Sequence, residues 1–276
     1  MTTLRNYSRL LRISQWYKNL IVFLPLTFTQ TYAPTELLIA FLGFSMASSI
    51  TYIINDWTDQ EADRLHPTKC HRPLASGKIS GKAAIITSLV LAGITILTMI
   101  TLGSFFASLV ISYILITNAY SFGLKNIPIL DITIIALNFV LRMMAGTLKL
   151  PTLETLPYFL LLFGLIIILV THKRRADIKF LGTKKAASHK PVLAFYTRPR
   201  NYLIRLIGFL ISTAAFTLLY QAGLPLLNIA ALLTLLATTS YFFSLDPLKV
   251  MKPQKLFKIW EWDLCLLANI LILVIL

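Results

Sequence analysis

The chain has 276 residues, of which 57% are hydrophobic and only 13% are charged. A water-soluble fold with this composition would expose large apolar patches, so the composition excludes a soluble domain and predicts an all-α, polytopic membrane protein. The formal net charge is +15, but the sequence contains no module of interleaved basic and aromatic residues, so nucleic acid is not an expected partner.

Nine apolar stretches are long enough to form transmembrane helices. They lie at about 20–34, 36–54, 83–102, 104–122, 129–147, 156–172, 202–220, 224–243 and 260–276. If these stretches cross alternately, 24 of the 26 Lys and Arg residues fall on one side, the exceptions being Arg142 and Lys149. The positive-inside rule makes that side cytoplasmic. We therefore expect one integral-membrane domain over 1–276 in the inner (plasma) membrane, with the N-terminus in the cytoplasm and the C-terminus outside.

An acidic cluster follows the second predicted span. If that helix continues past Asn55, then Asp56, Asp59 and Asp63 are spaced i, i+3, i+7 and share a face within about 60°, whereas Glu61 points elsewhere. Three carboxylates on one face repel each other and need a cation. Oxygen ligands without His or Cys suit Mg²⁺, whose shell is commonly completed by substrate phosphate. The pattern predicts a Mg²⁺ site on these three aspartates.

Basic residues follow the acidic cluster and would complete an anion site. Lys acts as a point charge for phosphate and Arg as a bidentate fork. Asn55 lies within the cluster, Lys18 lies at the entry of the first span, and Tyr120 and Lys125 precede the fifth span. The cations directly after the acids are Arg64, Lys69 and Arg72. A solvated charged loop is the alternative, but it would not require the acids to share a face.

A second polar stripe lies in the fifth predicted span. Asp131, Asn138 and Arg142 are spaced i, i+7, i+11, which places them within about 40° on one face, with Arg142 about 16 Å deeper than Asp131. Charged residues inside a span usually face the interior of the bundle. We expect the stripe to face the first polar site. Two interpretations of Arg142 stay open: a substrate ligand, or a buried arginine bonded to helix carbonyls.

The acidic segment N55-D56-W-T-D59-Q-E-A-D63 resembles the NDxxDxxxD signature of the UbiA-type membrane prenyltransferase superfamily. Members of that superfamily have nine transmembrane helices and bind a diphosphate through Mg²⁺ at the cytoplasmic side. Four further segments resemble its decaprenyl-phosphate phosphoribosyltransferase branch: SQWYKNLIVFLPL, HPTKCHRPLASGKI, YSFGLKNIPILDI and HKRRADIKFLG. The resemblance extends over most of the first 200 residues.

The resemblance implies a Mg²⁺-dependent transfer of 5-phosphoribosyl from 5-phosphoribosyl 1-diphosphate to a decaprenyl-type polyprenyl phosphate, with release of pyrophosphate. The second pKa of a phosphate monoester is near 6, so the attacking oxygen is already ionised and no catalytic histidine is needed. Asp131 would lie beside the ribose, and Lys173 and Arg174 would face the 5-phosphate. Asp177 is the one acid where aromatic prenyltransferases carry a second acidic pair.

The predicted site therefore has two groups of residues. Those assigned to catalysis are Asp56, Asp59, Asp63, Lys125 and Asp131. Those assigned to substrate binding are Lys18, Asn55, Arg64, Lys69, Arg72, Tyr120, Arg142, Lys173, Arg174 and Asp177. The expected partners are polyprenyl phosphate, phosphoribosyl diphosphate and the membrane, and association of several copies of the chain is left open.

Two other classes of function compete with this interpretation. An aromatic prenyltransferase of the same superfamily would move a prenyl chain from its diphosphate to an aromatic ring, and it predicts the second acidic pair that is missing here. A transporter would place polar residues at the membrane midplane and often shows internal repeats. The acids of this chain gather at one face, and we find no repeat.

Overall fold

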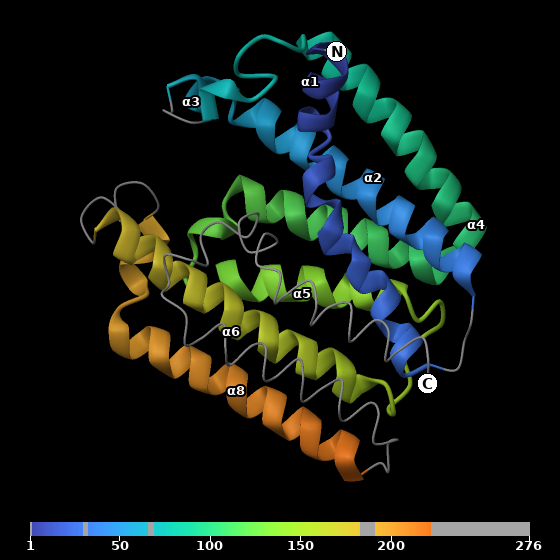
Figure 1. Ribbon diagram of the computed structural model, residues 1–276, viewed down its shortest axis with the longest axis vertical. Coiled ribbons are helices and arrows are strands. Elements are labelled where there is room, and N and C mark those ends of the chain that lie inside the picture. The colour runs from blue at the N-terminus through green and yellow to red at the C-terminus, as the bar shows by residue number, and fades with distance from the viewer. Residues whose placement is uncertain (1, 30–32, 66–68, 183–190, 222–276) are drawn as a thin grey trace. The chain divides into compact units, whose positions relative to one another are not determined.

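The structure is a computed structural model that describes residues 2–29, 33–65, 69–182 and 191–221, and this part of the chain is helical, without strands (Figure 1). The α-helices are α1 (Thr2–Leu10), α2 (Pro34–Thr58), α3 (Gln60–Arg64), α4 (Gly81–Phe122), α5 (Leu130–Ala145), α6 (Leu156–Leu181) and α8 (Arg198–Gln221). Short 3₁₀ segments connect them: η1 (Ile13–Thr27), η2 (Lys69–His71), η3 (Leu124–Asn126) and η4 (Pro191–Phe195). The all-α prediction is confirmed for the described residues.

Four described helices are long and apolar enough to cross a membrane: Pro34–Thr58, Gly81–Phe122, Leu156–Lys179 and Arg198–Leu219. They agree with the spans predicted at 36–54, at 83–102 together with 104–122, at 156–172 and at 202–220. Within α4, Gly103 has a left-handed backbone (φ 85°, ψ −177°), a conformation that favours glycine. It separates two helical arms where the sequence predicts a boundary between spans.

The remaining predicted spans have different outcomes. The 16-residue helix α5 corresponds to the prediction at 129–147, and η1 covers part of 20–34. The stretches at 224–243 and 260–276 lie outside the described residues, so the count of nine spans stays a prediction. So does the orientation of the termini.

The chain divides into two compact units, each described here by itself. The first comprises residues 1–124 and 138–151, and the second comprises residues 125–137 and those from 152 onward. Helix α5 therefore contributes its first half to the second unit and its second half to the first. The assignment of one domain to 1–276 stays a prediction.

The core of the first unit lies between α2 and α4. Proline is favoured in the first turn of a helix, and Pro34 begins α2. A Cβ atom added at Gly43 would lie 2.6 Å from Oγ1 of Thr98 on α4, so the glycine permits the close approach of the two helices. The ring of Phe44 contacts those of Phe106 and Tyr113, with centroids 5.8 Å and 5.5 Å apart. These buried aromatic side chains fix α2 against α4.

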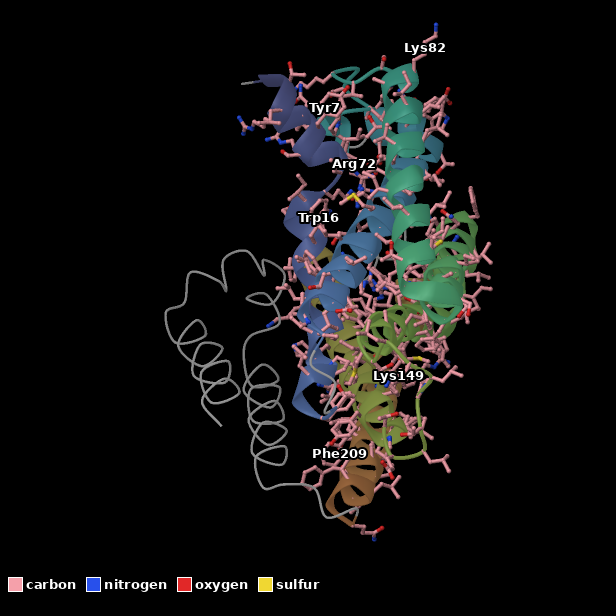
Figure 2. All side chains as sticks on the ribbon, turned by 90° about the vertical axis from the view of Figure 1, so that its right-hand side faces the viewer. Tyr7, Trp16, Arg72, Lys82, Lys149 and Phe209 are labelled. Carbon is pink, nitrogen blue, oxygen red and sulfur yellow. The ribbon has the colours of Figure 1, made fainter. Side chains whose placement is uncertain are left out.

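A second hydrophobic cluster in the first unit attaches the N-terminal segment to the C-terminal half of α2. The sequence predicts this end of α2 at the cytoplasmic side of the membrane. Leu10 and Leu74 are buried in it, and Tyr7 and Trp16, both labelled in Figure 2, pack against it. The indole of Trp16 also donates to Oγ of Ser49 on α2 (3.1 Å). This attachment positions the basic N-terminal segment beside the acidic end of α2.

The second unit is organised by α6 and α8, which run side by side in opposite directions (Figure 1). A Cβ atom added at Gly164 of α6 would lie 2.6 Å from the carbonyl oxygen of Gly208 on α8. The two backbones approach each other closely here because neither position carries a side chain. Helix contacts through small residues are common in membrane proteins, where apolar burial alone does not drive association.

Candidate functional site

The acidic segment does not form the continuous helix that was predicted. Helix α2 ends at Thr58, Asp59 lies in a turn with φ −90° and ψ 5°, and α3 begins at Gln60. Nδ2 of Asn55 donates to Oδ2 of Asp59 (3.3 Å). Short polar side chains that bond locally compete with the helix and favour its ends. The face predicted for three carboxylates is therefore interrupted at the middle one.

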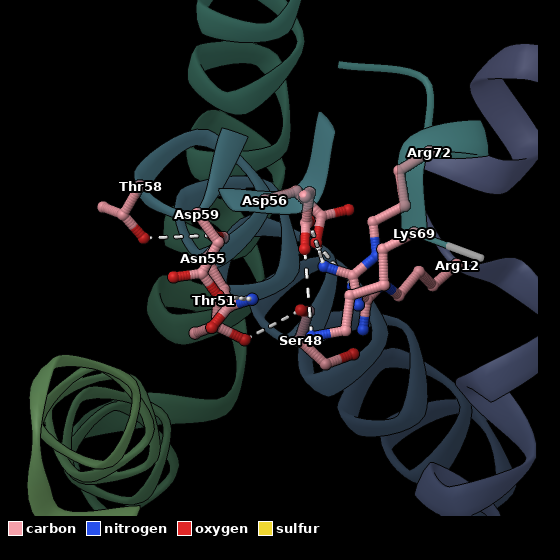
Figure 3. A network of polar contacts seen from close by, with 10 residues as sticks. Arg12, Ser48, Thr51, Asn55, Asp56, Thr58, Asp59, Lys69 and Arg72 are labelled. Carbon is pink, nitrogen blue, oxygen red and sulfur yellow. Dashed lines mark hydrogen bonds and ion pairs between the residues drawn. The ribbon is translucent and has the colours of Figure 1, made fainter. Parts of the chain in front are cut away.

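Asp56 and Asp63 nevertheless converge, on the guanidinium of Arg72. Its Nη1 donates to Oδ1 of Asp56 (3.0 Å) and to Oδ2 of Asp63 (2.6 Å). Nη2 of Arg12 lies 2.5 Å from the same oxygen of Asp56, and Nζ of Lys69 lies 3.8 Å from Oδ1 of Asp63. Both carboxylates are 2% exposed. Two buried negative charges are thus neutralised by three cations (Figure 3).

Asp59 lies apart from this pair. In Figure 3 it lies with Asn55 and Thr58, away from Arg72. No three His, Cys, Asp or Glu side chains in the described ranges are arranged to hold a metal ion. The structure brings together two of the three predicted metal ligands and does not bring the third to them.

The arrangement nevertheless suits a divalent cation. One nitrogen of Arg72 lies between two buried carboxylates. Carboxylate oxygens without His or Cys are the donors that Mg²⁺ prefers. Buried charges of one sign require a counter-charge, and Arg72 supplies it here.

The loop that carries Arg72 is held in place by α3. Nε2 of Gln60 donates to the carbonyl of Leu74 (3.0 Å), and Nε of Arg64 donates to the carbonyl of Ala75 (3.3 Å). These bonds hold the backbone at Leu74 and Ala75 against α3. Arg64, predicted as a substrate ligand, is therefore bonded to the loop backbone.

Arg12 is a functional candidate that sequence reasoning missed, since it was counted only among the Lys and Arg residues of the cytoplasmic side. Its backbone is left-handed (φ 50°, ψ 45°) between α1 and η1, a conformation that non-glycine residues seldom adopt. Its guanidinium lies 4.5 Å from the ring centroid of Tyr52. The sequence offers no local signal for this role, because Asp56 is 44 positions away.

A second polar cluster lies in the second unit around Asp131, which is 0% exposed. Nε and Nη2 of Arg174 both lie 3.0 Å from its Oδ2. The hydroxyl of Tyr196 donates to its Oδ1 and accepts from the backbone N–H of Ile129. Burial, followed by this bond to Asp131, raises the pKa of Tyr196 well above its usual value. Tyr196 was not predicted, whereas the pairing of Arg174 with Asp131 joins two predicted residues.

Arg142 lies in a third polar cluster, in the first unit. Its Nε donates to Oδ1 of Asn19 (2.7 Å), Nη1 to the carbonyl of Asn138 (2.7 Å) and Nη2 to the hydroxyl of Tyr113 (3.0 Å). The sequence left two interpretations of Arg142 open, and the bond to the carbonyl of Asn138 is the contact expected of a buried arginine bonded to helix carbonyls. Asn138 and Arg142 belong to the first unit and Asp131 to the second, so whether the stripe faces the acidic site stays a prediction.

The other predicted residues are partly buried or exposed. Lys18 is partly buried on η1, with Nζ 6.0 Å from the ring centroid of Tyr17. Asp177 lies 3.9 Å from Nη1 of Arg174. Tyr120 is partly buried near the end of α4, and Lys125 is partly buried in η3. Lys173 is exposed on α6.

Comparison with known proteins relates this geometry to a family. The sequence model of the UbiA prenyltransferase family matches residues 20–262. An uncharacterised protein of Sinorhizobium fredii is 41% identical over 140 residues, which are 49% of this chain and 27% of that protein. The decaprenyl-phosphate phosphoribosyltransferase of Corynebacterium glutamicum is 34% identical over 68% of this chain and 58% of the enzyme. The chain thus spans less than two thirds of either relative.

The fold also resembles a solved structure, that of a UbiA homolog from Archaeoglobus fulgidus bound to GPP and Mg²⁺. The TM-score is 0.71, and the match covers 98% of this chain and 99% of the archaeal one. At 19% identity, this likeness concerns the fold alone.

Proposed function

We propose that this chain, which belongs to the UbiA prenyltransferase family and is an integral membrane protein, is a phosphoribosyltransferase. It transfers the 5-phosphoribosyl group of 5-phosphoribosyl 1-diphosphate to a polyprenyl phosphate of the decaprenyl type. The products are polyprenylphosphoryl-5-phosphoribose and pyrophosphate. The proposal is supported by the activity of the Corynebacterium glutamicum relative and by the residues around Asp56.

The observation that carries the proposal is the pairing of two buried carboxylates with three cations. A diphosphate with Mg²⁺ needs oxygen donors for the metal and positive donors for the remaining phosphate oxygens. Asp56 and Asp63, with Asp59, would hold Mg²⁺, which neutralises charge on the leaving pyrophosphate when it is bound. Arg12, Arg72 and Lys69 would then bind diphosphate oxygens.

The acceptor supplies its own nucleophile. The second pKa of a phosphate monoester is near 6, so a lipid phosphate oxygen is ionised at neutral pH. That oxygen forms a bond with C1 of the ribose, and the bond from C1 to the diphosphate oxygen breaks with its electron pair leaving on pyrophosphate. In-line displacement would invert the configuration at C1. The role of the protein is to position the donor and neutralise the leaving group, and no side-chain base is required.

The roles predicted for the other residues belong to the same proposal. Asp131 would lie beside the ribose, and Lys173 and Arg174 would face the 5-phosphate. Lys125, Tyr120 and Lys18 would contribute further phosphate contacts, and Asp177 would belong to the substrate-binding residues. We propose Mg²⁺ as the only cofactor.

The deciding experiment supplies purified protein with Mg²⁺, polyprenyl phosphate and phosphoribosyl diphosphate, and mass spectrometry follows the lipid. We expect a lipid heavier by one phosphoribosyl group, with pyrophosphate released in equal amount. The competing reaction is tested with prenyl diphosphate and an aromatic acid. Product from that pair, with no reaction of phosphoribosyl diphosphate, would replace our proposal by aromatic prenyl transfer.

A further inference from the structure

A basic cavity lies between α6 and α8, in a part of the second unit that the proposed reaction does not use. Its volume is about 480 Å³, and it is lined by Arg175, Lys179, Arg198, Asn201, Tyr202 and Arg205. Four of these six lining side chains are cationic and none is acidic. Asp177 lies between Arg175 and Lys179 in the sequence, but its carboxylate is near Arg174 (3.9 Å). The lining therefore concentrates positive charge.

The basic cavity continues into an apolar one. A second cavity of about 370 Å³ is lined by Ile168, Tyr202, Arg205, Leu206 and Phe209, so the two cavities share Tyr202 and Arg205. Phe209 is 55% exposed and Leu206 is 40% exposed. The combined surface has a cationic part and a hydrophobic part in direct contact.

The helical spacing orders these two parts along the bundle. Arg198, Tyr202, Arg205 and Phe209 are spaced i, i+4, i+7, i+11 on one face of α8. Phe209 thus lies about 16 Å farther along the helix than Arg198. On the antiparallel α6, Ile168 lines the apolar cavity together with Phe209, and Lys179 lines the basic cavity together with Arg198. The basic ends of both helices are the ones that the sequence predicts at the cytoplasmic surface of the membrane.

The position of the cations is fixed by the packing beneath them. Asn201 is 2% exposed, and its Nδ2 donates to the carbonyl of Thr171 on α6 (2.8 Å), which joins the two basic ends. Arg175 and Arg205 line the same cavity, and like charges that share a small cavity repel each other. A bound anion would relieve that repulsion, and positive charge near a membrane surface attracts anionic lipids.

We infer that the cavity between α6 and α8 is a binding site for a lipid phosphate, with the phosphate head among Arg175, Arg198 and Arg205 and the hydrocarbon chain along Leu206 and Phe209. Two membrane lipids carry this chemistry: a phosphate monoester such as a polyprenyl phosphate, and a phosphodiester such as phosphatidylglycerol. No residue that lines the cavity is assigned to the donor, so binding there can be tested without the proposed reaction; only a preference for the monoester would rest on the proposed function, because the acceptor is a monoester.

The test measures binding to the intact protein in a neutral detergent by native mass spectrometry and calorimetry, without donor or Mg²⁺. Farnesyl phosphate, phosphatidylglycerol and inorganic phosphate serve as probes. The variant Arg175→Gln/Arg205→Gln removes two lining cations. The matched control, Arg5→Gln/Arg200→Gln, removes the same charge from exposed positions on α1 and α8 that do not line the cavity.

We expect the lining variant to weaken binding of at least one tailed phosphate by about tenfold or more, and the control to bind like the unmodified protein. Phe209→Ser should weaken tailed probes and leave inorganic phosphate unchanged. If the lining variant binds both lipids more weakly, the cavity is a site for phosphate lipids in general. If it binds only farnesyl phosphate more weakly, the cavity is a site for phosphate monoesters. Equal binding by the lining variant and the control would overturn the inference, as would equal affinity for inorganic phosphate and both lipids.

Correct folding is checked by monodisperse elution and an unchanged unfolding midpoint. If the double variant fails this check, Lys179→Gln replaces it, because Lys179 is exposed and lines the cavity. It must then show the same selective loss of lipid phosphate binding for the inference to stand.

Discussion

Nη1 of Arg72 donates to Oδ2 of Asp63 at 2.6 Å, and the same nitrogen donates to Asp56. The chain thereby keeps a cation of its own between two buried carboxylates. These two carboxylates are among the residues that we propose as Mg²⁺ ligands. Metal binding would have to displace Arg72 from the carboxylates, which leaves its guanidinium available for phosphate.

The first prediction concerns this exchange. Arg72→Met should lower the metal-free free energy of unfolding by about 1–3 kcal/mol, because Asp56 and Asp63 lose a shared counter-charge. The loss is smaller than for a fully buried pair, since the Arg72 side chain is 26% exposed. Mg²⁺ should then raise the thermal unfolding midpoint more in this variant than in the unmodified protein. Arg5→Met, at an exposed position, is the control. An equal Mg²⁺ effect in all three proteins would contradict the exchange.

The second prediction separates the acidic residues. Asp56→Asn and Asp63→Asn should each lower phosphoribosyl transfer by about 10²–10³-fold, because the leaving diphosphate loses electrostatic stabilisation, and each should reduce the Mg²⁺ effect on the unfolding midpoint. Glu61→Gln, which changes an exposed acid on α3, should retain most of the activity. Asp59→Asn should also lower transfer, because Asp59 is proposed as the third Mg²⁺ ligand, and a loss as large as at Asp56→Asn would mean that substrate draws Asp59 to the pair. An equal loss at Glu61 would contradict the assignment.

The third prediction concerns the buried pair of the second unit. Arg174→Gln should destabilise the protein by about 3–5 kcal/mol, because Asp131 is 0% exposed and would keep an uncompensated charge. Arg174→Gln/Asp131→Asn should recover part of that stability, since a neutral amide needs no counter-charge. Lys173→Gln, on the exposed side of α6, should leave the unfolding midpoint unchanged and weaken donor binding. If the double variant were no more stable than Arg174→Gln, loss of the ion pair with Asp131 would not be the cause of the destabilisation.

The fourth prediction is a pH dependence of stability. The pKa of Tyr196 is raised in the folded protein, first by burial and then by its bond to Asp131. The folded state therefore holds the phenolic proton more tightly than the unfolded state. This contribution is fully present below the ordinary tyrosine pKa of 10.0 and is lost as the pH rises above it. Between about pH 10 and pH 12, the unfolding midpoint should fall more steeply in the unmodified protein than in Tyr196→Phe. If the unfolding midpoints of the two proteins fell in parallel as the pH rises, Tyr196 would not be the source of the pH dependence.

The fifth prediction tests the contact between α6 and α8. Gly164→Ala should destabilise the protein by about 1–3 kcal/mol, because the added Cβ would lie 2.6 Å from the carbonyl oxygen of Gly208 and the helices would have to separate. Gly93→Ala on α4 is the matched control, since nothing lies within 4 Å of its added Cβ. The control should be neutral or slightly stabilising, because alanine favours the helix. Thermal unfolding of both variants measures the difference, and similar midpoints would contradict the close approach.

The sequence by itself determined the helical class, the four long membrane-spanning helices of the described part and the existence of an acidic segment followed by cations. It also located the boundary at Gly103 inside α4. These features are local, because a long apolar stretch in a membrane satisfies its backbone hydrogen bonds within itself when it forms a helix. Residue types within one short segment were therefore sufficient.

Tertiary structure decided which residues of the acidic segment come together. The periodicity of a single helix assigned Asp59 to the same face as Asp56, but local bonds from Asn55 end that helix and turn Asp59 aside. Arg12 and Tyr196 reach Asp56 and Asp131 from 44 and 65 positions away. No local pattern encodes such partners, because they depend on how separate segments pack once a buried charge has to be neutralised.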